Sequence, residues 1–88
     1  MMMKKYTEKD FETFERDENG RLICPSGDYT AIRTFPERCS FGAGSTFGQG
    51  CDFGRWSRFE EECSFGERCV FSEGCSFGWF LVESEAVE

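Results

Sequence analysis

The hydrophobic and polar positions of this chain follow a period of six over most of its length. From Cys39 onward, phenylalanine returns at every sixth residue, and a cysteine or serine stands two places before it. Seven consecutive matches predict a repeat architecture rather than an ordinary globular core. The phenylalanines are Phe41, Phe47, Phe53, Phe59, Phe65, Phe71 and Phe77, and the small residues are Cys39, Ser45, Cys51, Ser57, Cys63, Cys69 and Cys75.

A period of six fits a chain of short strands with a corner in every unit. It does not match the 3.6-residue period of an amphipathic helix. The phenylalanine and the small residue four places later have an even separation, so in extended chain both point to the same side, which we assign to the core. Glycine follows phenylalanine in five of the seven units, and we expect this glycine to form the corner. Counting back by six places Tyr29 and Phe35 in register, so the predicted repeat spans Tyr29 to Val82.

Written from its phenylalanine, the unit reads Phe-Gly-x-x-Cys/Ser-x. It resembles the hexapeptide repeat of left-handed parallel β-helices, aliphatic-Gly-x-x-small-x, with phenylalanine in place of the aliphatic residue. The resemblance implies an all-β fold, a small three-sided parallel β-helix with eighteen residues to a coil and about three coils. The central phenylalanine also resembles that of the pentapeptide-repeat proteins, which form a right-handed square β-helix, but their period is five.

Eighteen residues to a coil would stack each aromatic residue on its equivalent in the next coil. Three ladders are then predicted, and small residues between them leave room for the rings. The ladders are Phe41–Phe59–Phe77, Tyr29–Phe47–Phe65 and Phe35–Phe53–Phe71.

The segment 1–28 precedes the repeat and is predicted to be an N-terminal cap. Thr7 followed by Asp10 resembles a capping box, which favours a short helix from Glu8 to about Phe14. The alternative is a strand over Phe11–Arg16 that pairs with Arg21–Cys24 through the turn at Asn19-Gly20. We expect a short helix or irregular lead followed by a hairpin, then the repeat over 29–82 and an acidic tail over 83–88.

Charge is concentrated in the second half of the chain. The 88 residues carry a net charge of −7, of which −1 falls in residues 1–38 and −6 in residues 39–88. This balance argues against direct binding to nucleic acid or to an anionic membrane and is compatible with a basic protein partner, although acidic surfaces also serve solubility. No apolar run suggests a signal peptide or a membrane span, so a cytoplasmic location is expected, in a bacterial host if the protein is encoded by a phage or a mobile element.

The six cysteines are candidates for a metal or iron–sulfur site, but the pattern favours a structural role. The chain has no histidine and no Cys-x-x-Cys motif, and serine takes equivalent places in the repeat. We therefore predict buried thiols without a metal or cofactor. Cys24 lies outside the repeat and is the thiol for which exposure is expected.

Enzymatic activity is not expected. Many left-handed β-helix proteins are acyltransferases, so the resemblance makes this activity a candidate. Those enzymes typically use a histidine base, and this chain has no histidine. An acyltransferase-like remnant therefore ranks third, after the two functions that are derived below.

In the unit 57–62, the glycine that usually follows phenylalanine is replaced by glutamate, and the segment Glu60-Glu61-Glu62 is negatively charged throughout. With Asp52, Glu67 and Glu73 it predicts an anionic band around a narrow rod. The band resembles the surfaces of pentapeptide-repeat proteins that mimic DNA and of acidic phage anti-CRISPR proteins. This resemblance implies a non-enzymatic inhibitor that binds a basic nucleic-acid-binding protein or complex. The alternative is a solvated charged face.

Trp56 and Trp79 occupy predicted outward places and complete the candidate binding residues. Trp56 stands between Arg55 and Arg58, which suggests cation–π packing on the surface, and tryptophan is also favoured at protein interfaces. The apolar run Trp79–Val82 either caps the last coil or pairs with a second subunit. The second possibility predicts an alternative function, a structural or assembly module that stacks end to end. The protein is accordingly expected to be either a monomer or an end-to-end dimer.

Overall fold

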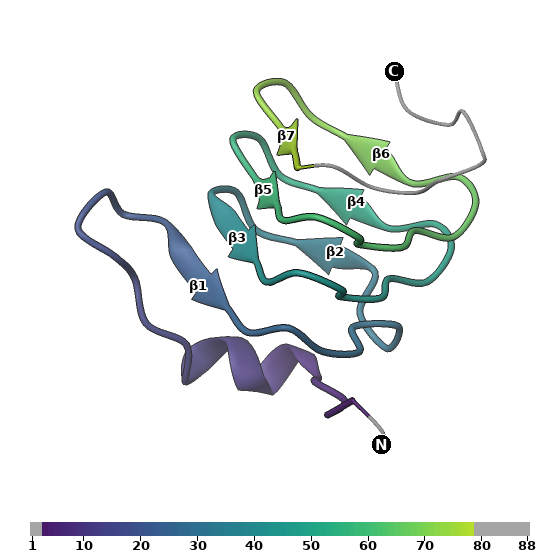
Figure 1. Cartoon of the computed structure of the whole chain (residues 1–88), viewed down its shortest axis with the longest axis horizontal. Coiled ribbons are helices and arrows are strands. Elements are labelled where there is room, and N and C mark those ends of the chain that lie inside the picture. Colours follow the sequence, from purple (N-terminus) through teal and green to yellow (C-terminus); the bar gives the residue numbers. More distant parts are fainter. Residues whose placement is uncertain (1–2, 79–88) are drawn as a thin grey trace.

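The computed structural model describes residues 3–78, which form a mostly-β fold with two parallel sheets (Figure 1). One sheet has the strand order β1-β3-β5-β7 and the other β2-β4-β6. Among these residues no helix is long and apolar enough to cross a membrane. The elements are the 3₁₀ helix η1 (Glu8–Glu12) and the strands β1 (Leu22–Cys24), β2 (Thr34–Phe35), β3 (Cys39–Phe41), β4 (Asp52–Phe53), β5 (Arg58–Phe59), β6 (Val70–Phe71) and β7 (Ser76–Phe77).

The strand register follows the sequence repeat. Phe41 pairs with Phe59, which pairs with Phe77, so the strands β3, β5 and β7 are eighteen residues apart. A third side has the same spacing, because Asp28, Thr46 and Ser64 form successive parallel bridges. We call each such eighteen-residue stretch a layer.

The core consists of three columns of stacked aromatic rings, as the spacing predicts. Within a column the rings are close to parallel, as in Phe53 on Phe71, with ring centres 5.0 Å apart and planes 3° apart. Between columns they meet edge to face, as in Phe41 and Phe47 at 4.9 Å and 84°. Both arrangements suit the quadrupole of the aromatic ring. The three predicted ladders are confirmed throughout the described residues.

The first layer contains a correction to the prediction for Cys24. Its side chain is buried, with 1% exposed, and its residue pairs with Phe41 in the sheet. Cys24 thus occupies the ring position of the first layer, and Leu22 occupies the small-residue position beneath Cys39. The period of six does not predict these two positions, because the register between β1 and β3 is seventeen residues rather than eighteen.

The corners of the chain are also placed differently from the prediction. A positive φ, which favours glycine, occurs at the residue just before the cysteine or serine and not at the glycine after phenylalanine. Gly44, Gly50 and Gly74 take this place with φ of 75°, 70° and 77°. The same place holds Arg38, Trp56, Glu62 and Arg68, with φ between 60° and 65°.

The glycine after phenylalanine has another physical role, which is to let two layers approach closely. A Cβ atom on Gly54 would lie 2.5 Å from the Cα and N atoms of Glu37 in the layer before. A Cβ atom on Gly66 would lie 2.7 Å from the N atom of Gln49. A side chain at Gly54 or Gly66 would require the backbone to move, so close approach favours glycine at these two positions, although Glu60 and Ser72 take the equivalent place in two other units.

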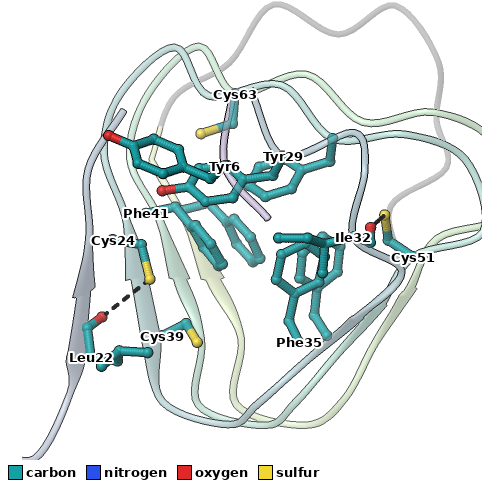
Figure 2. Close-up of a cluster of buried hydrophobic side chains, with 13 residues drawn as sticks. Tyr6, Leu22, Cys24, Tyr29, Ile32, Phe35, Cys39, Phe41, Cys51 and Cys63 are labelled. Carbon is teal, nitrogen blue, oxygen red and sulfur yellow. Dashed lines mark hydrogen bonds between the residues drawn. The ribbon is translucent and has the colours of Figure 1, made fainter. Parts of the chain in front are cut away.

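The N-terminal segment covers one end of the aromatic columns. The expected capping interaction is present, since the Thr7 amide donates to Asp10 Oδ2 at 2.8 Å, and η1 ends at Glu12. Tyr6 stacks on Tyr29 with ring centres 5.1 Å apart (Figure 2), and Phe11 packs edge-on against the same ring.

The hairpin part of the N-terminal prediction is present as a narrow antiparallel contact. Arg16 and Leu22 form an antiparallel bridge, and the Ile23 amide donates to the Glu15 carbonyl at 2.8 Å. Gly20, in the predicted turn, has φ of 81°. The predicted roles of Trp79–Val82 and of the tail 83–88 lie outside the described residues.

Candidate protein-binding surface

The unit 57–62 carries the candidate site and has the same inward residue types as the neighbouring units. Its inward pair, Ser57 and Phe59, is buried, each with 1% exposed. Glu60, Glu61 and Glu62 follow β5 at a corner and are all exposed. The unit therefore keeps the scaffold of its neighbours and changes only its surface, as the sequence predicts.

The other predicted carboxylates lie at different corners or faces. Glu67 and Glu73 belong to the turns before β6 and β7, and Asp52 begins β4 in the preceding layer. All are exposed. None of the six carboxylates stands eighteen residues from another, so they surround the structure in a ring rather than forming rows along it.

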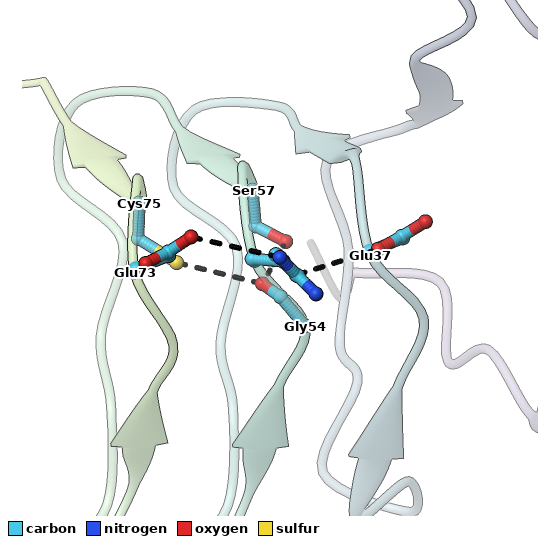
Figure 3. Close-up of polar contacts among 6 residues, drawn as sticks. Glu37, Gly54, Ser57, Glu73 and Cys75 are labelled. Carbon is cyan, nitrogen blue, oxygen red and sulfur yellow. Dashed lines mark hydrogen bonds and ion pairs between the residues drawn. The ribbon is translucent and has the colours of Figure 1, made fainter.

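An ion-pair ladder partly neutralises one corner of this ring. Arg55 lies between Glu37 and Glu73, with its nitrogens 3.9 Å and 3.6 Å from their carboxylate oxygens (Figure 3). These three residues are spaced by eighteen, which is the signal that links them in the sequence. The side chains are more than half exposed, so each pair stabilises the fold by about 0–1 kcal/mol.

Glu60, Glu61 and Glu62 have no such compensation. Within residues 3–78, the ion pairs are those of Arg55. In the layer before, Gly42, Ala43 and Gly44 occupy the equivalent corner, and they bring no charge. We call the Glu60–Glu62 segment the acidic corner, and it is the strongest local concentration of unpaired negative charge at the predicted site.

Trp56 is exposed as predicted, but its contact differs from the prediction. It is 42% exposed, and in the part of the chain that the structure describes, the one cation–π contact joins Lys4 to Tyr6. The Trp56 ring instead covers Gly74 of the next layer, where an added Cβ would lie 2.2 Å from the ring. Trp79 lies outside the described residues.

The cysteines and serines of the repeat hydrogen-bond to the main chain of the turns. Ser57 Oγ donates to the Gly54 carbonyl at 2.9 Å, and Cys51 Sγ makes the equivalent contact with the Gly48 carbonyl at 3.2 Å. A residue of the next layer reaches the same acceptor, as Cys75 Sγ does with Gly54 at 3.5 Å (Figure 3). Within the repeat from Cys39 onward, this position therefore suits a small side chain with a donor, which serine and cysteine both provide.

The environment of the thiols disfavours ionisation. Burial raises the pKa of Cys63 and of Cys75, and burial together with the neighbouring Cys69 raises the pKa of Cys51 to about 11. A hydrogen bond with Cys39, together with burial, raises the pKa of Cys24. These thiols are neutral at physiological pH. Between Met3 and Gly78 no group of three or more His, Cys, Asp or Glu side chains is placed to hold a metal ion.

Comparisons with protein-family models, with curated proteins and with solved structures gave no match for this chain.

Proposed function

We propose that the layers are the coils of a three-sided parallel β-helix of the hexapeptide-repeat type, and that this β-helix is a non-enzymatic protein-binding inhibitor. The eighteen-residue register on three sides and the inward phenylalanine and cysteine or serine support the fold. The partner we propose is a basic nucleic-acid-binding protein or complex, whose groove the acidic surface of the β-helix occupies in place of DNA. An anti-defence protein of a phage or mobile element, such as an anti-CRISPR, has this character.

The observation that carries the proposal is the acidic corner. Three adjacent carboxylates are exposed and unpaired there, on a unit whose inward residues match those of its neighbours. Glu67 lies at the next corner of the same layer and adds to this charge, whereas Glu73 is paired with Arg55 and Asp52 lies in the preceding layer. Because surface charges attract a partner over a distance of about 10 Å at 0.1 M salt, such a ring favours a basic groove over a neutral one.

Reversing the charge of the acidic corner is expected to abolish partner binding without unfolding the protein. The variant Glu60→Lys/Glu61→Lys/Glu62→Lys changes three exposed side chains, so its melting temperature should stay close to that of the parent. Proteins captured from a bacterial lysate at low salt should include a nucleic-acid-binding protein that duplex DNA displaces. Its affinity for the variant, measured with the purified partner, should fall by about tenfold or more, equivalent to about 1.4 kcal/mol.

A matched control uses three exposed carboxylates in the N-terminal segment. The variant Glu12→Lys/Glu15→Lys/Glu18→Lys makes the same change in net charge and should keep most of the binding. Equal losses in both variants would show a response to net charge alone. Undiminished binding by the Glu60–Glu62 variant would contradict the proposal.

The alternative function, an assembly module that stacks end to end, is favoured by a different observation. The N-terminal end of the columns is covered by Tyr6 and Phe11, whereas Phe65 and Phe71 in the last complete layer are only half-buried. An assembly module would oligomerise with increasing concentration, and substitutions at Trp79 would affect that oligomerisation more than charge reversal at the acidic corner.

A further inference from the structure

Two of the thiols occupy directly stacked positions in neighbouring layers. Cys51 immediately precedes β4 and Cys69 immediately precedes β6, and these strands pair in parallel with Asp52 opposite Val70. The Val70 amide donates to the Cys51 carbonyl at 2.8 Å. The two cysteines are therefore one strand spacing apart in the stack.

Their side chains point to the same place. Cys51 Sγ lies 3.2 Å and Cys69 Sγ 3.4 Å from the carbonyl oxygen of Gly48. Adjacent strands lie about 4.8 Å apart, and that separation falls within the Cα–Cα range of about 4.4–6.8 Å over which disulfides form. The shared acceptor and the backbone spacing together permit a bond between the two sulfurs.

The neighbouring columns do not offer such a pair. Cys63 stands above Ser45 and shares the Gly42 carbonyl with it, and Cys75 stands above Ser57 in the same way. Each of these columns therefore has only one sulfur at the shared carbonyl, and Cys51–Cys69 is the directly stacked cysteine pair within residues 3–78.

Cys24 and Cys39 also interact through their thiols, but their backbones are badly placed for a bridge. The sheet pairs Leu22 with Cys39 and Cys24 with Phe41, so the two cysteines are offset by two residues along neighbouring strands. This diagonal is about 8 Å for a strand spacing of about 4.8 Å and a rise of about 3.3 Å per residue, which exceeds the limit of about 7 Å for disulfide formation without backbone movement.

We propose that Cys51 and Cys69 form a redox-responsive pair, which oxidation converts into a disulfide between two layers. Cys69 is the half-buried member and reacts first with a small-molecule disulfide such as oxidised glutathione. Its thiolate attacks one sulfur of that molecule, forms a mixed disulfide and expels glutathione thiolate. Cys51, after giving its proton to solvent, attacks Cys69 Sγ and expels the second glutathione thiolate. The two protein thiols lose two electrons and two protons, and one oxidised glutathione becomes two glutathione thiols.

The bond would close a loop of about eighteen residues and restrict the unfolded chain. Closing a loop of this size is expected to raise the free energy of unfolding substantially. For a chain this small, that gain corresponds to a rise in melting temperature on the order of 10 °C. Reduction reverses the reaction. The pair is thus a site at which the redox state of the surroundings sets the stability of the layers.

The test oxidises the reduced, full-length protein with oxidised glutathione under native conditions. The expected product is 2 Da lighter than the reduced protein, contains a peptide cross-link between Cys51 and Cys69, and melts on the order of 10 °C higher. Cys51→Ser and Cys69→Ser should lose the cross-link and the rise in melting temperature. Both place serine where the repeat already uses it, so they are expected to fold.

Cys75→Ser is the matched control, because Cys75 is also half-buried but stands above a serine. This variant should form the cross-link as the parent does. A cross-link between other cysteines, a product that stops at the glutathione adduct, or an unchanged protein mass would each overturn the proposal, and peptide mapping of the parent alone distinguishes them.

Discussion

Replacing Phe59 by alanine is expected to destabilise the protein by about 3–5 kcal/mol, the cost of removing a large buried aromatic side chain. Phe59 is 1% exposed and stacks between Phe41 and Phe77, with ring centres 5.3 Å and 5.2 Å away. Its removal interrupts one column in the middle and leaves a cavity that the surrounding rings cannot fill. Since a chain of this size has a total stability of only about 4–13 kcal/mol, little folded protein should remain, as measured by thermal or urea denaturation.

Phe71→Ala is the control for this prediction. Phe71 is only half-buried and stacks on Phe53, so its removal should cost clearly less than that of Phe59. A Phe59→Ala variant that melts within a few degrees of the parent would show that the ring columns do not hold the layers together.

Gly54→Ala is expected to destabilise the protein by about 1–3 kcal/mol, although it adds a single methyl group. The added Cβ would lie 2.5 Å from the main-chain Cα and N of Glu37. Backbone atoms cannot rotate away as a side chain can, so the two layers must separate locally and lengthen the hydrogen bonds between them. Urea denaturation of the variant and the parent measures the loss.

Gly48→Ala provides a matched comparison within the same repeat position. Its added Cβ would be 3.3 Å from the Thr30 carbonyl oxygen, a tight contact that a small shift relieves. Alanine also lowers the entropy of the unfolded chain relative to glycine, which offsets part of any cost. We expect Gly48→Ala to change stability by less than about 1 kcal/mol, and equal losses for the two variants would exclude close layer contact as the reason for glycine.

The repeat made the core predictable, because spacing alone decides which residues face inward. The aromatic columns and the outward Glu60–Glu62 followed from even separations and the eighteen-residue period. Glycine has two different roles in this sequence, since it allows close approach at Gly54 and a positive φ at Gly44. The residue type does not distinguish these two roles, and the predicted positions of the corners were therefore wrong. At the second kind of corner the chain accepts Trp56, so no residue type identifies it.

The first layer was the harder part to predict. Cys24 occupies a ring position without being aromatic, and a register of seventeen residues removes it from the period of six. Tyr6 extends the column of Tyr29 from a segment that has no repeat at all. The ion-pair ladder through Arg55 follows the eighteen-residue spacing of Glu37, Arg55 and Glu73, and the contact of Trp56 with Gly74 has the same spacing.

The eighteen-residue register, which is constant from β2 and β3 onward, has a consequence for how the chain folds. Each pairing of β3 with β5, or of β4 with β6, closes a loop of eighteen residues, so each new layer costs nearly the same loop-closure entropy as the one before. The ring stacking and hydrogen bonds that repay this cost are also nearly the same from layer to layer. Folding can therefore begin between any two adjacent layers and spread in both directions, as expected for a one-dimensional array whose units contact only their neighbours.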